Sequence, residues 1–220
     1  GDLGCYMTGL RAQDERISEK GVLRWTKEMM LALDYLHQEN IVHRDMKPLN
    51  VFLTHDGHVK LGDFGLASTT MKEKNQSKVG TPCYLAPEVL QNEDYGGGID
   101  VWGVGCIAFE MMTFEFLWER KGMLSVQVLS RAITPFDFPQ DYSQALRDMV
   151  VKMLDKDPNL RPSPRQVAKG CALLEQGGSS KSLAEGPLSP LAGFDALAQG
   201  LAGHVEALWN NNNNNNNNNN

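Results

Sequence analysis

The sequence predicts an α+β fold that is mainly helical and carries one short β-hairpin. Two observations support this prediction. Apolar residues recur at three- and four-residue steps along several segments, which is the period of an α-helix. Two runs rich in β-forming residues, 51–54 and 58–61, flank the dipeptide Asp56-Gly57, which favours a hairpin turn. With 220 residues, 41% of them hydrophobic, the chain is long enough to bury a core.

The first long helix is predicted over residues 18–40. Ser18 is a good N-cap residue, and the segment ends just before the polar stretch that begins at His43. Its apolar stripe is interpreted as core and consists of Val22, Trp25, Met29, Leu33 and Leu36.

Three more helical segments follow the hairpin. A loop with three glycines leads into a strongly apolar helix within residues 95–112. Residues 142–154 are amphipathic, and the turn-rich link 155–163 precedes a last helix that passes through Cys171.

Composition changes after this last helix. We expect residues 1–175 to form the folded domain and residues 176–209, rich in Gly, Ser, Ala and Leu, to form a flexible tail with one weakly helical stretch. The unbroken asparagine run 210–220 is interpreted either as undetermined sequence written as N or as a low-complexity tract.

Charge and cysteine content exclude several classes. The net charge of −6 offers no basic field for nucleic acid, and no apolar run approaches the length of a membrane span. The four cysteines lack C-x-x-C spacing, which is typical of reduced thiols in an intracellular protein. We therefore expect a cytoplasmic protein without nucleic-acid or membrane partners, with a cytoskeletal or nuclear location also open.

One motif pair dominates the remaining sequence. Residues 43–50 read H-R-D-x-x-x-x-N, and D-F-G follows at residues 63–65, after the predicted hairpin. Residues 80–88 begin with G-T-P and end with A-P-E. In this order the motifs resemble the catalytic loop, metal-binding loop and activation segment of protein kinases. A chance H-R-D tripeptide is the alternative, and the agreement of several separate motifs argues against it.

The resemblance implies transfer of a phosphoryl group from ATP with the help of Mg²⁺. Such catalysis consists mostly of positioning and of cancelling negative charge. Asp45 would accept or orient the proton of the attacking hydroxyl, and Lys47 would place a cation beside the transferred group. Asn50 and Asp63 would supply the oxygen ligands that Mg²⁺ prefers, and Gly65 lets the backbone turn after the metal ligand.

Two further residues are implied at the nucleotide, in addition to Lys47, Asn50 and Asp63. Asp2 lies where kinases contact the ribose, although it could equally be an ordinary helix N-cap. Phe52 lies where kinases place an apolar residue beneath the adenine ring, although simple core packing is the alternative.

Other positions would hold the catalytic loop and the activation segment in shape, together with the motif residues His43 and Phe64. Asp100, in D-x-W-x-x-G, would accept backbone hydrogen bonds from the catalytic loop, and a helix cap is the alternative. Arg161 would pair with Glu88 of the A-P-E motif, the alternative being a solvated surface arginine.

The resemblance also suggests regulation. Phosphorylation of Ser77, four residues before Thr81, would order the polar loop 67–79 by pairing with Arg44. Ser68, Thr69 and Thr70 are alternative sites, and an unmodified polar loop is the remaining interpretation.

Lys47 and Thr81 fit Ser/Thr specificity, so the expected partners are proteins with Ser or Thr acceptors. The strings N-V-F-L-T (50–54) and V-K-L-G-D-F-G (59–65) are most similar to NIMA-related kinases, which would also allow a homodimer formed outside this chain. Gly103 departs from the pattern, because many kinases have Ser there.

The sequence lacks the glycine-rich loop, the V-A-I-K lysine and the partnering helix glutamate that cover ATP in kinases. We therefore expect a C-terminal kinase lobe without its N-terminal lobe, inactive alone and an incomplete part of an active enzyme. A non-catalytic binding module is the main alternative. A small-molecule phosphotransferase is disfavoured, because an activation segment ending in A-P-E serves protein substrates.

Overall fold

The longest helix that the structure describes, α2, spans Glu19–Gln38. In this computed structural model the described residues are 1–68, 82–117 and 133–177. Ser18 caps α2, its hydroxyl accepting a hydrogen bond from the Gly21 amide at 3.2 Å. The predicted stripe is buried along its whole length, comprising Val22, Trp25, Met29, Leu33 and Leu36. The predicted helix 18–40 and its role in the core are therefore confirmed.

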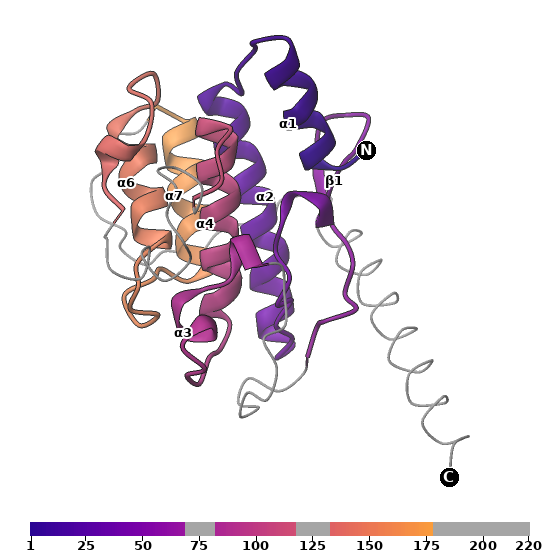
Figure 1. The fold of residues 1–220 in the computed structure, drawn as a ribbon, viewed down its shortest axis with the longest axis vertical. Helices are drawn as coiled ribbons and strands as arrows, with labels where there is room; N and C mark the ends of the chain where they lie inside the picture. The colour runs from indigo at the N-terminus through magenta and orange to yellow at the C-terminus, as the bar shows by residue number, and fades with distance from the viewer. Residues whose placement is uncertain (69–81, 118–132, 178–220) are drawn as a thin grey trace. The chain divides into compact units, whose positions relative to one another are not determined.

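A two-stranded antiparallel sheet lies beside α2. Strand β1 (Val51–Leu53) pairs with β2 (Val59–Leu61) in the register Val51↔Leu61 and Leu53↔Val59. Gly57 in the connecting turn has φ of 78°, a value that glycine adopts without strain. The predicted hairpin is confirmed, and Figure 1 shows β1 near the N-terminus of the chain.

Helix α4 (Gly98–Thr113) is apolar on all sides. A helix of this kind must be surrounded by protein, and almost every residue of α4 is buried. It ends where Phe114 adopts a left-handed conformation with φ of 55°.

The other helical elements frame these three. Their bounds are α1 Leu3–Ala12, η1 Pro48–Asn50, η2 Pro82–Tyr84, α3 Pro87–Leu90, η3 Pro135–Asp137, α6 Gln144–Met153 and α7 Pro164–Glu175. Helices α6 and α7 match the amphipathic segments that the sequence predicts. The 3-10 turns and α3 are too short to show a helical period, so no pattern in the sequence predicted them.

One hydrophobic core joins the elements. Helix α2 contacts α4, α7 and β2, and α4 contacts α6 on its other side (Figure 1). Lys27 of α2 forms an ion pair with Glu175 at the end of α7. These parts belong to one compact unit, Gly1–Leu183, and the predicted tail beyond residue 177 lies outside the described residues.

Two chemical features follow from this arrangement. All four cysteines are free thiols, two of them buried. Within the described ranges no helix is both long and apolar enough to cross a membrane.

Candidate active site

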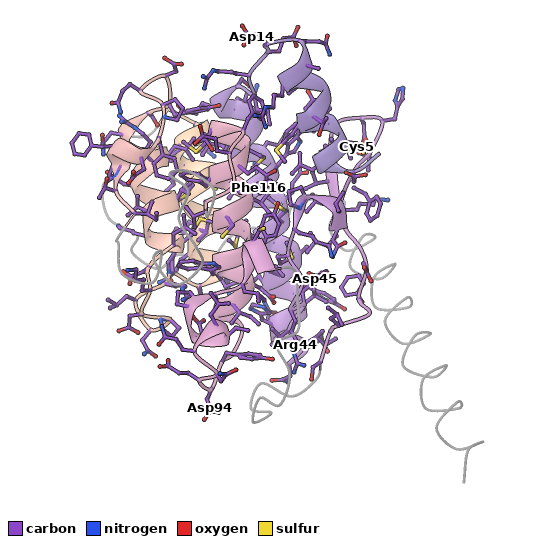
Figure 2. The ribbon with its side chains drawn as sticks, in the orientation of Figure 1. Cys5, Asp14, Arg44, Asp45, Asp94 and Phe116 are labelled. Atoms are coloured by element: carbon purple, nitrogen blue, oxygen red, sulfur yellow. The ribbon has the colours of Figure 1, made fainter. Side chains whose placement is uncertain are left out.

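The catalytic-loop motif lies in the segment between α2 and β1 (Figure 2). Asp45 is 6% exposed, and its Oδ2 accepts hydrogen bonds from Lys47 Nζ at 2.5 Å and from Asn50 Nδ2 at 3.1 Å. Asn50 Nδ2 also donates to the backbone carbonyl of Asp45 at 2.8 Å. These contacts bring three predicted site residues together and stabilise the negative charge of the Asp45 carboxylate.

His43 connects this loop to the segment that precedes Asp63. The Asp45 amide donates to His43 Nδ1 at 3.4 Å, and His43 Nε2 lies 3.1 Å from the Gly62 carbonyl. Because Nδ1 accepts, we assign the proton of the neutral ring to Nε2, which then donates to Gly62. The His43 ring also contacts the Phe64 ring, with centroids 5.1 Å apart.

Asp100 holds the backbone of the catalytic loop. Its two carboxylate oxygens accept from the amides of His43 and Arg44, both at 2.9 Å, and the residue is 1% exposed. Arg44 has a φ of 70°, a left-handed conformation that is unusual for a residue other than glycine. The N-cap of α4 is Gly97, so the alternative role of Asp100 as a cap does not hold.

Asp63 and Asn50 lie at the open end of the hairpin. The Gly62 amide donates to the Asn50 carbonyl at 2.9 Å, which places the residue before Asp63 directly beside Asn50. Asp63 is exposed, has a φ of 56°, and accepts from the Gly65 amide at 3.3 Å. One amide oxygen and one exposed carboxylate are the hard oxygen donors that Mg²⁺ prefers, so these residues fit that ion.

The two residues predicted at the nucleotide are neighbours. Asp2 forms a β-bridge with Phe52, so the residue before α1 runs along the outer edge of β1. Phe52 is 45% exposed and is not part of the core, so the core-packing alternative is wrong. An exposed aromatic ring at this position is a suitable surface for a planar base.

Asp2 is also the N-cap of α1. Its Oδ1 accepts from the Cys5 amide at 2.8 Å, and this hydrogen bond holds the pKa of the Asp2 carboxyl below its ordinary value. The capping role that the sequence left open is therefore present in the structure. It occupies one carboxylate oxygen.

Glu88 and Arg161 form a buried bidentate ion pair. Arg161 donates through Nη1 and Nη2 to the two carboxylate oxygens of Glu88 at 2.6 and 2.7 Å, and both side chains are at most 2% exposed. Arg161 also donates to the carbonyls of Asp155 and Gly98, and its guanidinium lies 5.1 Å from the Trp102 ring centroid. The alternative of a solvated surface arginine is wrong.

The predicted regulatory positions Ser77 and Thr81, with Thr69 and Thr70, lie outside the described residues. Ser68 is described, and its backbone pairs with Val42 through two hydrogen bonds, of 3.0 and 3.1 Å. The second residue of the predicted polar loop 67–79 is therefore paired with the residue just before the catalytic-loop motif.

Sequence reasoning missed three residues that contact the site or its supports, namely Tyr95, His37 and Glu28. The Arg44 guanidinium lies 5.8 Å from the ring centroid of Tyr95, and His37 Nε2 lies 2.8 Å from Asp100 Oδ2. Glu28 of α2 contacts the backbone of β2. Each contact joins segments that are far apart in the chain, and no motif or spacing marks it. Only the place of Glu28 beside the predicted core stripe of α2, three residues after Trp25, could have suggested a role.

Comparison with known proteins identifies the family. Residues 3–170 match the model of the protein kinase domain, so the chain belongs to the protein kinase domain family. More particularly, its relatives are NIMA-related kinases, as the sequence motifs predicted. Serine/threonine-protein kinase Nek6 of Oryza sativa subsp. japonica is 37% identical over 161 residues, 72% of this chain and 30% of that protein. Serine/threonine-protein kinase Nek4 of Mus musculus is 34% identical over 173 residues, 77% of this chain and 21% of that protein. The chain thus spans less than a third of the length of these relatives.

Proposed function

We propose that this chain is the catalytic part of a protein serine/threonine kinase that transfers the γ-phosphoryl group of ATP to Ser or Thr hydroxyls of protein substrates. The observation that carries the proposal is the buried Asp45 carboxylate, bonded to Lys47 and Asn50. One short motif thus brings together an acid, a cation and an amide, which are the groups that positioning and charge neutralisation in phosphoryl transfer require. The names of the relatives, which are Ser/Thr kinases, support the same function.

The roles of the residues follow from their contacts. Asp45 orients the acceptor hydroxyl and takes up its proton, while the acceptor oxygen bonds to the γ-phosphorus and the bond from that phosphorus to ADP, the leaving group, breaks. Lys47, 2.5 Å from Asp45, carries the positive charge that faces the transferred group. Asn50 and Asp63 would hold Mg²⁺, which when bound supplies further neutralisation of phosphate charge. Phe52 and Asp2 would contact the base and the ribose.

The biological setting belongs to the same proposal. The partners are proteins with Ser or Thr acceptors, and dimerisation would use regions outside this chain. We propose a cytoplasmic location, with association with the cytoskeleton or the nucleus as further options.

The decisive experiment replaces Asp45 in the full-length protein. Incorporation of radioactive phosphate from ATP and Mg²⁺ into a mixed protein substrate is measured for the parent and for Asp45→Asn. Loss of the proton acceptor should reduce turnover by about 10²–10⁴-fold. Removal of Mg²⁺ with EDTA should abolish turnover in the parent protein.

Asp141→Asn is the matched control, because Asp141 is an exposed aspartate outside the site. It should leave turnover unchanged. A parent protein that transfers no phosphate, or an Asp45→Asn variant as active as the parent, would contradict the proposal. The first result would favour a non-catalytic binding module.

A further inference from the structure

The hairpin is attached to α2 at the end remote from the metal-binding residues. Glu28 of α2 accepts a hydrogen bond from the Val59 amide at 2.8 Å through Oε2, and its Oε1 lies 2.7 Å from His58 Nδ1. On the preceding turn of α2, Trp25 Nε1 donates to the Gly57 carbonyl at 3.0 Å. The Glu28 side chain is 12% exposed and that of His58 is 51% exposed, so the bond to the Val59 amide is better shielded from water than the contact with His58.

The hairpin needs such an anchor. Each strand has only three residues, and a two-stranded sheet of this size is marginal by itself in water. The orientation of the hairpin must therefore be set by the elements against which it packs. Asn50 precedes β1 and Asp63 follows β2, so any rotation of the hairpin moves both residues.

The same helix also determines the place of Asp45. The chain leaves α2 at Gln38 and reaches the catalytic loop within a few residues, where Asp100 holds the backbone. A side chain of α2 that is hydrogen-bonded to the hairpin therefore connects two parts of the site. One part is the catalytic loop with Asp45, and the other is the hairpin with Asn50 and Asp63. We propose that Glu28 is a positioning residue that sets the two metal-binding residues relative to Asp45. This inference rests on the proposed function.

Charge contributes to this anchor. Arg24 donates from Nε to Glu28 Oε1 at 3.3 Å, and its Nη2 lies 3.0 Å from His58 Nε2. The anchor is therefore a small cluster in which two side chains, Arg24 and His58, and the Val59 amide surround the Glu28 carboxylate. Glutamine at position 28 could keep one oxygen as an acceptor for the Val59 amide, and it would lose the charge and the second oxygen that faces Arg24 and His58.

The test measures metal binding without turnover. The full-length protein, saturated with ADP, is titrated with Mn²⁺, and free Mn²⁺ is followed by electron paramagnetic resonance. Loss of a residue that orients metal ligands typically weakens metal affinity by about 10-fold or more, so Glu28→Ala should show a change of this size. Glu28→Gln should recover most of the affinity, because it can still accept the Val59 amide.

Two further variants complete the design. Glu39→Ala, at an exposed glutamate that caps the same helix, should bind Mn²⁺ like the parent. If Glu28→Ala does not fold, His58→Ala serves instead, because it removes one contact of the Glu28 carboxylate and leaves its bond to the Val59 amide in place. It should weaken Mn²⁺ binding by a smaller factor.

The outcomes separate this inference from the proposed function. Unchanged Mn²⁺ affinity in folded Glu28→Ala, or in His58→Ala where that variant replaces it, would overturn the positioning role. If thermal stability fell while Mn²⁺ affinity stayed unchanged, Glu28 would stabilise the fold without positioning the metal-binding residues. Absence of phosphotransfer by the parent protein would instead contradict the proposed function. The Mn²⁺ titration can be read in either case, because it measures metal binding and needs no turnover.

Discussion

Gly62 shows how a single residue connects the parts of the site. Its amide donates to Asn50, its carbonyl accepts from His43, and a β-carbon at this position would lie 2.6 Å from a carbon of the Phe52 ring. Any side chain here would push the ring away from its present place. Glycine fits at position 62 because the backbone there lies too close to the Phe52 ring to leave room for a side chain.

Asp2 has a role that is measurable without any ligand. Asp2→Ala removes the α1 N-cap and should lower the free energy of unfolding by about 0.5–2 kcal/mol at pH 7, whereas Asp2→Asn should retain most of it. The folded-state pKa of Asp2 is lowered by the Cys5 amide, so its contribution is present above the unfolded pKa. The part that depends on the carboxylate charge is lost as the pH falls through the folded pKa, which lies below the ordinary value of an aspartate.

Urea unfolding of the parent and Asp2→Ala at pH 7 and near pH 2.5 would measure this effect. The difference between the two proteins should shrink at the lower pH. An equal difference at both pH values would show that the carboxylate charge does not stabilise α1.

At the scale of elements, the contact between α4 and the catalytic loop depends on Gly103. A β-carbon on Gly103 would lie 2.6 Å from Met46 Cβ and 3.4 Å from the Met46 carbonyl oxygen. Met46 follows Asp45 directly, so the loop can approach the helix this closely only with glycine at position 103. Glycine at position 103, where many kinases have serine, is therefore compatible with this close approach.

Gly103→Ser should therefore push the loop outward. Overpacking of this kind costs about 1–3 kcal/mol of stability. Displacement of Asp45 should lower kcat by about 10- to 100-fold. Gly9→Ala is the control, because the β-carbon added in α1 meets nothing within 4 Å. Thermal unfolding and turnover of the full-length protein check both values, and a Gly103→Ser variant with normal turnover would contradict this account.

The Glu88–Arg161 pair joins α3 to the link before α7. Arg161→Met would leave a buried carboxylate without its cation, and the loss in stability should be on the order of 3–5 kcal/mol. Arg165→Met, at an exposed arginine of α7, should change stability little.

A double variant, Glu88→Gln with Arg161→Met, provides the check on this pair. Because it buries no unpaired charge, it should lose less than the sum of the two single variants in chemical unfolding. Additive losses would mean that the two side chains do not act as a pair.

At the scale of the whole molecule, a single core encloses α4 and one face of α2. Cys106 and Cys171 lie inside it at 2% and 0% exposure. Burial raises the pKa of both thiols, that of Cys171 to about 12. The thiolate is the reactive form, so neither sulfur should react while the core is intact.

Thiol alkylation at pH 8 followed by peptide mapping should therefore label Cys5 first, because Cys5 is exposed. Its pKa is raised by the hydrogen bond and charge of Asp2, so this labelling should also be slow relative to a free thiol. Cys106 and Cys171 should be labelled only across the urea unfolding transition. Labelling of Cys171 at the rate of Cys5 in native protein would show that the core opens locally.

Much of this molecule could be predicted from local patterns. Ser18, the apolar stripe of α2 and the Asp56-Gly57 turn predicted two central elements, because capping, helical period and turn chemistry act over a few neighbouring residues. The motif order also pointed to Asp45, Asn50 and Asp63 as one site, and to the partnership of Glu88 with Arg161.

The sequence by itself determined the family, the main helices and the residue types of the site. Only the tertiary structure decided which side chains hold that site in place: His37 on Asp100, Glu28 on the hairpin, Gly103 against Met46 and the Phe52 ring on Gly62. The physical reason is that most of these contacts join residues that are tens of positions apart. They depend on how whole elements pack together, and a single sequence carries no local signal for such packing.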